Sequence, residues 1–222
     1  IYSPPGMEEL VETNLRLCGV RVPVTYPIHL HVVEATAFDR VFDDPLLEVF
    51  SVPLSHRGVA CCGWLFREKT RLRNLRPEKI AEYDIPYPLL PGIKAGQDLV
   101  LPGGQTVPND ELTLPPRAPL SYAFCSDTAP SDQVAEWVRG VDLLYHEATF
   151  TSEHTTEADL SGHSTAAQAA EIARKAGVKR LLLGHFSGRY TDTAAHLTEA
   201  QAIFPNTVVS EEGISYEIAS HE

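Results

Sequence analysis

The second half of the chain alternates short apolar runs with stretches that are apolar on one helical face. The apolar runs, each bounded by polar or turn-forming residues, are typical of strands and lie at 120–128, 141–150, 179–185, 207–210 and 213–218. Helices are predicted between them at 130–140, 164–177 and 192–204. In the second of these, Thr165 and Gln168 can form a capping box, and Gly177 can end the helix. Strands that alternate with helices indicate a layered α/β or α+β domain.

The first half opens with a Pro-Pro-Gly turn and a predicted helix. Apolar side chains recur at roughly helical spacing before Gly19, a natural helix end, at Met7, Leu10, Val11, Leu15 and Leu17. Apolar or β-branched runs then predict strands at 28–35, 46–56 and 60–68. We therefore expect one domain over residues 1–222, interrupted by the segment described next.

Between residues 67 and 119 the pattern changes. Prolines recur and periodicity is weak, which indicates an extended insertion outside the core. Six of the 18 basic residues fall within thirteen positions here: Arg67, Lys69, Arg71, Arg73, Arg76 and Lys79. This cluster is either a solvated positive patch or a docking surface for nucleic acid.

Composition narrows the class of protein. A hydrophobic content of 43% with 22% charged residues is typical of a globular domain, and no apolar run reaches the roughly 18 residues of a membrane span. The first ten residues lack the layout of a signal peptide, and the four cysteines lack zinc-finger spacing. We therefore expect a reducing, cytoplasmic setting. The net charge of −12 argues weakly against a polyanionic partner.

Three predicted strands end in side chains that can bind metal. His56, Asp127 and His185 each follow an apolar run. Imidazole nitrogen and carboxylate oxygen are suitable zinc donors, and a carboxylate can bridge two ions. Each residue alone could instead be an ordinary loop histidine or turn aspartate.

Glu147 and His163 form a second group of candidates. Glu147 ends another strand, and His163 precedes the helix at 164–177. A carboxylate beside a histidine suits a proton donor to a leaving group. The alternative, that both side chains are exposed and unrelated, is at least equally compatible with the spacing.

The remaining histidines are weaker candidates. His29 and His31 share one face of a predicted strand, but no Asp-His follows them, so we interpret them as an exposed strand face. No partners are predicted for the other three, His154, His196 and His221.

Six segments follow one another along the chain: FSVPLSHR, FCSDT, LLYHEATF, GHSTAAQAAEIA, LLLGHFSGRY and EAQAIFPNT. Taken in this order, they resemble the ribonuclease Z family of the metallo-β-lactamase superfamily. The opening segment IYSPPGMEEL is similar to the family's Tyr-Gly-Pro strand-to-helix segment, so the resemblance covers nearly the whole chain. It implies a four-layer αββα sandwich with a dinuclear zinc centre at one edge.

The resemblance also implies roles for the candidate residues. His56 matches a ligand of one zinc ion, His185 a ligand of the other, and Asp127 the bridging carboxylate. His163 matches the proton donor to the departing 3′ oxygen, and Glu147 the residue that orients it.

Further implied roles concern the substrate. Ser187 and Arg189 would lie near the scissile phosphate, and the segment at 67–119 matches the family's tRNA-gripping exosite arm. The basic residues at the base of that arm would contact RNA: Arg67, Lys69, Arg71 and Arg73. The implied reaction removes the 3′ trailer of precursor tRNA by metal-hydroxide attack, in a homodimer. Two alternatives stay open, namely another hydrolase of the superfamily and a non-catalytic RNA-binding remnant.

One family motif is absent. The loop H-x-H-x-D-H, which supplies most metal ligands, occurs nowhere in these 222 residues. We therefore expect the chain to be the carboxy-terminal portion of the fold. Because three ligands would leave two zinc ions under-coordinated, we expect this polypeptide alone to bind zinc weakly and to be inactive.

Overall fold

A computed structural model describes residues 1–18 and 26–218. The chain forms two compact units, one made of Ile1–Arg67 with Leu120–Glu222 and the other of Glu68–Pro119. No helix among the described residues is long and apolar enough to cross a bilayer.

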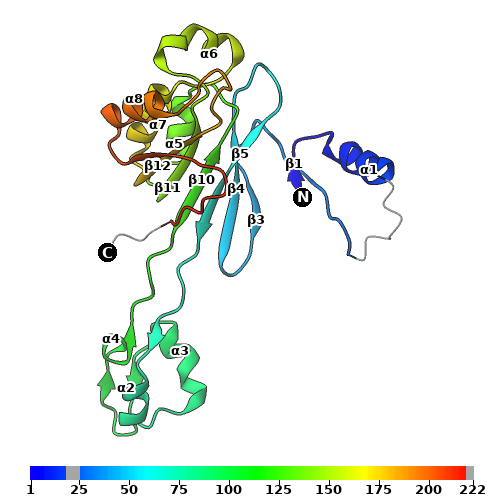
Figure 1. The fold of residues 1–222 in the computed structure, drawn as a ribbon. Helices are drawn as coiled ribbons and strands as arrows, with labels where there is room; N and C mark the ends of the chain where they lie inside the picture. The colour runs from blue at the N-terminus through cyan, green and yellow to red at the C-terminus, as the bar shows by residue number, and fades with distance from the viewer. Residues whose placement is uncertain (19–25, 219–222) are drawn as a thin grey trace. The chain divides into compact units, whose positions relative to one another are not determined.

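The first unit is built on a sheet of seven strands (Figure 1). Four neighbouring strands are parallel, whereas β10 is antiparallel to β5 and β3 is antiparallel to β4. In spatial order the strands are β13 (Thr207–Val209), β12 (Arg180–Gly184), β11 (Leu143–Glu147), β10 (Ser121–Cys125), β5 (Cys62–Glu68), β4 (Leu47–Pro53) and β3 (Arg40–Asp43). The predicted α/β domain is thus confirmed.

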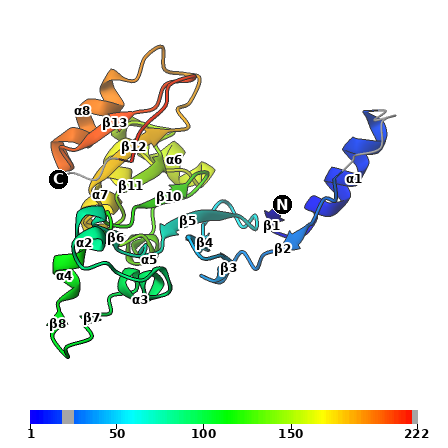
Figure 2. The same ribbon diagram turned by 90° about the horizontal axis from the view of Figure 1, so that it is seen from below.

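Three helices cover one face of this sheet, as Figures 1 and 2 show. They are α5 (Asp132–Trp137), α7 (Ala166–Ala176) and α8 (Ala194–Ile203). Alternate strand residues such as Leu144, Leu181 and Leu183 are fully buried against them, as period-two patterning requires. The capping box of Thr165 and Gln168 begins α7 and Gly177 ends it at φ 62°, so both predicted caps are confirmed.

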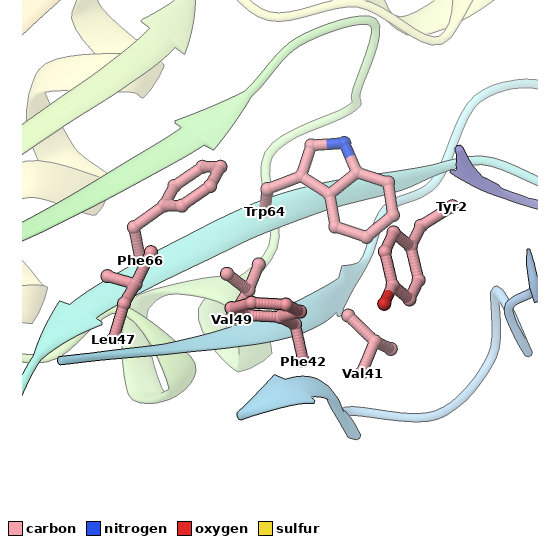
Figure 3. Close-up of a pocket in the computed structure, with 7 residues that line it drawn as sticks. All are labelled: Tyr2, Val41, Phe42, Leu47, Val49, Trp64 and Phe66. Carbon is pink, nitrogen blue, oxygen red and sulfur yellow. The ribbon is translucent and has the colours of Figure 1, made fainter. Parts of the chain in front are cut away.

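The opposite face of the sheet is apolar and partly open. Seven side chains line a hollow of about 370 Å³ there (Figure 3): Tyr2, Val41, Phe42, Leu47, Val49, Trp64 and Phe66. Of the four layers that the resemblance implies, the described residues contain this one large sheet and the helical layer against it.

The amino-terminal segment has the predicted helix but less strand than expected. Helix α1 (Met7–Leu17) has no buried residue, and β1 (Tyr2–Ser3) pairs with β2 (His31–Val32) in parallel. The predicted strand at 28–35 is thus wrong except for two residues. His29 and His31 are exposed, as interpreted from the sequence. Gly19, expected to end the helix, and His221 lie outside the described residues.

The carboxy-terminal strand predicted at 213–218 does not form. The side chain of Tyr216 folds back instead, and its hydroxyl donates to the carbonyl oxygen of Val209 at 3.0 Å. Propensity alone favoured a strand here, and β13 is left as the edge of the sheet.

The second unit has a small core of its own. Five apolar side chains are buried together: Ile85, Ile93, Leu99, Val107 and Leu112. Its short elements are β6 (Asn74–Leu75), α2 (Pro77–Glu82), η1 (Tyr87–Leu89), α3 (Leu90–Lys94), β7 (Leu99–Val100), β8 (Thr106–Val107), α4 (Asn109–Leu112) and β9 (Thr113–Leu114). The segment that we expected to be an extended insertion outside the main core thus forms a separate unit with a small core of its own.

Candidate metal centre

Parallel strands bring the candidate residues to one edge of the sheet. Cys125 pairs with His146 and Glu147 pairs with Gly184, so β10, β11 and β12 end side by side. His185 follows β12 directly and Asp127 follows β10 after one residue, with φ of 58° and 55°. Such left-handed backbone is uncommon outside glycine and often marks functional sites. These sharp turns place both side chains at the rim.

Three side chains form a group that can hold a metal ion. Donor atoms of Asp127, His163 and His185 all lie within 4.8 Å of one another. The Nε2 atom of His185 is 3.0 Å from Oδ1 of Asp127, and the rings of His163 and His185 are stacked at 5.2 Å. Two imidazoles and a carboxylate are donors that zinc and similar divalent ions accept. His163, expected to be a proton donor, is therefore also within reach of a metal held by the other two.

His56 lies beside this group without belonging to it. Its ring centroid is 4.7 Å from that of His163, and its Nδ1 is 3.2 Å from the carbonyl oxygen of Gly162. The backbone N–H of Ser55 donates to the Thr128 hydroxyl at 3.2 Å, which fixes the end of β4 against the loop after β10. The structure thus brings together the ends of three strands, as the sequence suggested.

Glu147 is fully buried and accepts five hydrogen bonds. His163 Nδ1 is 2.6 Å from Oε1 of Glu147, and the Thr128 backbone N–H donates to the same oxygen at 2.9 Å. Oε2 accepts from the backbone N–H groups of Ser164 and Thr149 and from the Thr149 hydroxyl. The alternative that Glu147 and His163 are exposed and unrelated is therefore wrong.

His56, His163 and His185 all use the same ring nitrogen to contact the protein. Each uses Nδ1 for a contact with the protein, to Gly162 O in His56, to Glu147 Oε1 in His163 and to Thr149 Oγ1 in His185. A carbonyl or carboxylate oxygen can only accept a hydrogen bond, so Nδ1 of His56 and of His163 carries the proton. Nε2 of each ring is left for a metal or a substrate.

Ser187 and Arg189 lie on the loop after β12. The Ser187 backbone N–H donates to Thr149 O at 3.0 Å. The Arg189 guanidinium lies 4.9 Å above the Phe150 ring, whose centroid is 6.4 Å from that of His163. Arg189 is thus on the site side of the sheet rim and 41% exposed.

No partners were expected for His154 and His196; this prediction is wrong for His154, whereas His196 has ring contacts but no hydrogen bond within the described part of the chain. The Tyr190 hydroxyl is 3.1 Å from Nδ1 of His154, in the 3-10 turn Ser152–His154 that leads into α6 (Thr155–Ser161). His196, fully buried on α8, meets the rings of Tyr190 and Phe186 edge-on at 4.5 and 4.9 Å. His196 and Ala200 share the buried face of a helix, a periodicity that could have indicated a core histidine.

The buried histidines predict acid sensitivity. Burial lowers the pKa of His146 and of His196 below the ordinary 6.5. As the pH falls below 6.5, these histidines therefore become protonated in the unfolded chain before they do in the folded chain, and the free energy of unfolding decreases. Each histidine should contribute at most about 1.4 kcal/mol per pH unit. Because neither ring nitrogen of His196 has a hydrogen-bond partner, His196→Phe should reduce the loss. Urea unfolding at about pH 7.5 and about pH 5.5 measures it, and equal losses in variant and wild type would contradict the prediction.

The basic residues expected to bind substrate already contact other side chains of the protein. Arg67 lies 5.3 Å from the Phe50 ring centroid, Arg71 pairs with Glu68 at 3.7 Å, and Arg73 pairs with Asp110 at 2.5 Å. Residues 68–119, which include Lys69, carry seven basic and seven acidic side chains, whereas the whole chain has a net charge of −12. This unit is therefore the less repulsive part of the chain for a polyanion.

Comparison with known proteins agrees with the motifs. A family model described as a Beta-lactamase superfamily domain matches residues 117–186. The chain is 42% identical over 212 residues to Ribonuclease Z of Porphyromonas gingivalis strain W83, which covers 96% of this chain and 69% of the relative. It is 40% identical over 222 residues to Ribonuclease Z of Bacteroides thetaiotaomicron, covering 100% of this chain and 69% of that relative. The chain belongs to the ribonuclease Z family.

Solved structures support the same fold. Human tRNase Z, short form, superposes with a TM-score of 0.57 at 18% identity, covering 99% of this chain and 68% of that one. The metallo-beta-lactamase fold protein YhfI of Bacillus subtilis gives 0.53 at 16% identity, covering 96% and 63%. The metallo-β-lactamase fold is thereby confirmed for this member of the ribonuclease Z family. The family implies the use of a divalent metal ion, and the donor atoms of Asp127, His163 and His185 fit such an ion.

Proposed function

We propose that this chain carries catalytic residues of an endoribonuclease that removes the 3′ trailer of precursor tRNA, cutting after the discriminator base. Membership of the ribonuclease Z family supports the substrate and the reaction. The single observation that supports the chemistry is the 2.6 Å contact from buried Glu147 to His163, beside the donors Asp127 and His185. A held histidine next to a metal-capable group is the arrangement that phosphodiester hydrolysis needs.

We assign the metal ligands as the resemblance implies. Asp127 would bridge two zinc ions, His56 would bind one ion and His185 the other. In His56 and His185 it is Nδ1 that contacts Gly162 and Thr149, so Nε2 is the ring nitrogen that would face the ions, and this supports the assignment. Bound zinc ions lower the pKa of water and offset phosphate charge. Their binding would also relieve the repulsion expected from a net charge of −12.

The chain's own side chains would then act on the substrate. His163, when protonated on both ring nitrogens, would give its Nε2 proton to the departing 3′ oxygen, while Glu147 holds the Nδ1 proton and thereby aims the ring. Arg189 would pair with a phosphate oxygen, since its guanidinium lies 4.9 Å over the Phe150 ring and is partly exposed. The Ser187 hydroxyl would contact the same phosphate.

The unit Glu68–Pro119 would serve as the exosite arm that grips tRNA. Its balanced charge supports an RNA contact better than the remainder of the chain does. Arg67, Lys69, Arg71 and Arg73 would contact phosphates, with Arg71 and Arg73 exchanging their carboxylate partners for them. In a homodimer, one subunit's arm would serve the active site of the other.

The number of metal-binding side chains limits how much zinc this polypeptide can hold. His56, Asp127, His163 and His185 together cannot complete four ligands on each of two zinc ions, and H-x-H-x-D-H is absent from the 222 residues. We therefore expect metal analysis of this polypeptide alone to give less than two equivalents of zinc. Two tightly bound equivalents would contradict this expectation.

A cleavage assay tests the function. Precursor tRNA with a 3′ trailer is incubated with zinc and either this polypeptide alone or the polypeptide joined to the family's H-x-H-x-D-H segment. We expect cleavage after the discriminator base by the joined form and little by the polypeptide alone. Hydrolysis of small phosphodiesters without tRNA cleavage would favour another hydrolase of the superfamily. Salt-dependent tRNA binding without turnover would favour a non-catalytic RNA-binding protein.

A further inference from the structure

Thr149 lies between the carboxylate of Glu147 and the imidazole of His185. It follows Glu147 by two residues and is only 7% exposed. Its hydroxyl oxygen is 2.7 Å from Oε2 of Glu147 and 2.9 Å from Nδ1 of His185. Its backbone N–H also donates to Oε2 of Glu147 at 3.1 Å, so the residue is fixed from both sides.

The direction of these hydrogen bonds follows from the number of protons. A hydroxyl has one proton and two lone pairs, whereas a carboxylate oxygen has none to give. The Thr149 proton therefore goes to Glu147, and the Thr149 oxygen accepts a proton from Nδ1 of His185. With its Nδ1 proton so engaged, His185 turns Nε2 toward Asp127, whose Oδ1 is 3.0 Å away.

We propose that Thr149 is a positioning residue that fixes the ring of His185 with its Nε2 lone pair available to a metal ion. This inference rests on the proposed function in one respect, the role of His185 as a ligand. Glu147 thereby orients two histidines at once, His163 directly through Oε1 and His185 through the Thr149 hydroxyl on Oε2. Outer partners of this kind hold both the tautomer and the orientation of a metal-binding histidine.

Substitution of Thr149 separates this role from simple packing. Thr149→Val keeps the shape but removes the hydroxyl, whereas Thr149→Ser keeps the hydroxyl and loses a methyl group. Thr151→Val is the matched control, because Thr151 is equally buried but its hydroxyl meets Tyr190 and contacts neither Glu147 nor His185. Thr149→Ala takes the place of the valine variant if that variant does not fold.

The quantity measured is the zinc affinity of the 222-residue polypeptide, determined by competition with a chelating dye. We expect Thr149→Val to weaken zinc binding by roughly 10- to 100-fold, the usual effect of losing such a partner, and Thr149→Ser and Thr151→Val to change it little. In the zinc-loaded chain, the NMR signal of the His185 Nδ1 proton should be slow to exchange in wild type and lost in Thr149→Val.

Each outcome decides the inference. Wild-type affinity in Thr149→Val would overturn the role of Thr149 while leaving the metal site standing. A His185 proton on Nε2 in the zinc-loaded wild type would overturn both the role of Thr149 and the assignment of His185 as a ligand, because a protonated nitrogen has no lone pair for the metal. Absence of zinc binding by the unsubstituted chain would overturn the metal site itself, and the inference with it. Equal losses in Thr149→Ser and Thr149→Val would assign the effect to packing and overturn the inference.

Discussion

Glu147→Gln is expected to slow trailer removal by roughly 100- to 10,000-fold, the usual contribution of a positioned proton donor. Five donors converge on the two oxygens of Glu147, and a glutamine offers only one oxygen. Its NH2 group would face donors in a fully buried site, which should also lower the free energy of unfolding by about 1–3 kcal/mol. Single-turnover cleavage of precursor tRNA by the form joined to the H-x-H-x-D-H segment measures the first effect, and urea unfolding measures the second.

The matched control for Glu147 is Glu171→Gln. Glu171 is exposed on α7 and pairs only with Arg174 three residues later, so its loss should cost little. A Glu147→Gln variant that cleaves at the wild-type rate would contradict the proposed proton donor. A slow variant with unchanged stability would still agree with a role for Glu147 in orienting His163, but not with five satisfied hydrogen bonds.

Asp127→Asn is expected to weaken zinc binding by more than roughly 100-fold. Loss of a residue that only hydrogen-bonds a metal ligand typically weakens binding by roughly 10- to 100-fold, and Asp127 itself would hold the ion. Asparagine tolerates left-handed backbone, so the φ of 55° at this position should be preserved. The effect should therefore appear in zinc affinity and not in stability. Chelator competition and thermal unfolding measure the two quantities.

Asp132→Asn provides the comparison for Asp127. Asp132 lies at the start of α5, where its side chain is exposed and paired with Lys175. We expect wild-type zinc affinity in this variant. If both aspartate variants bound zinc like the wild type, the assignment of Asp127 as a bridging ligand would be wrong.

The central layer of the fold could be predicted because its signals are local. The apolar runs at 141–150 and 179–185 became β11 and β12, and the capping box and Gly177 bounded α7 as expected. The candidate residues could be placed because the ends of parallel strands meet at one edge of a sheet. The sequence placed Asp127 and His185 at strand ends, and the pairing of the strands in the structure brings the two side chains to 3.0 Å.

Other features depend on contacts that sequence patterns do not encode. The core of Glu68–Pro119 is made from five apolar residues, of which four lie on elements too short for a period to be visible and Ile85 lies between elements. The contact between His154 and Tyr190 joins residues 36 positions apart, as does the contact between Thr149 and His185. Such pairs become visible only when β11 and β12 lie side by side. The chemical roles of the site residues stay predictions.

Anomalous X-ray scattering from zinc in crystals of the full chain tests the central claim most directly. The account predicts a zinc peak about 2.0–2.2 Å from a carboxylate oxygen of Asp127 and about 2.0–2.1 Å from Nε2 of His185. Ordered zinc that leaves both side chains uncoordinated, or no zinc at this edge of the sheet at saturating concentration, would contradict it.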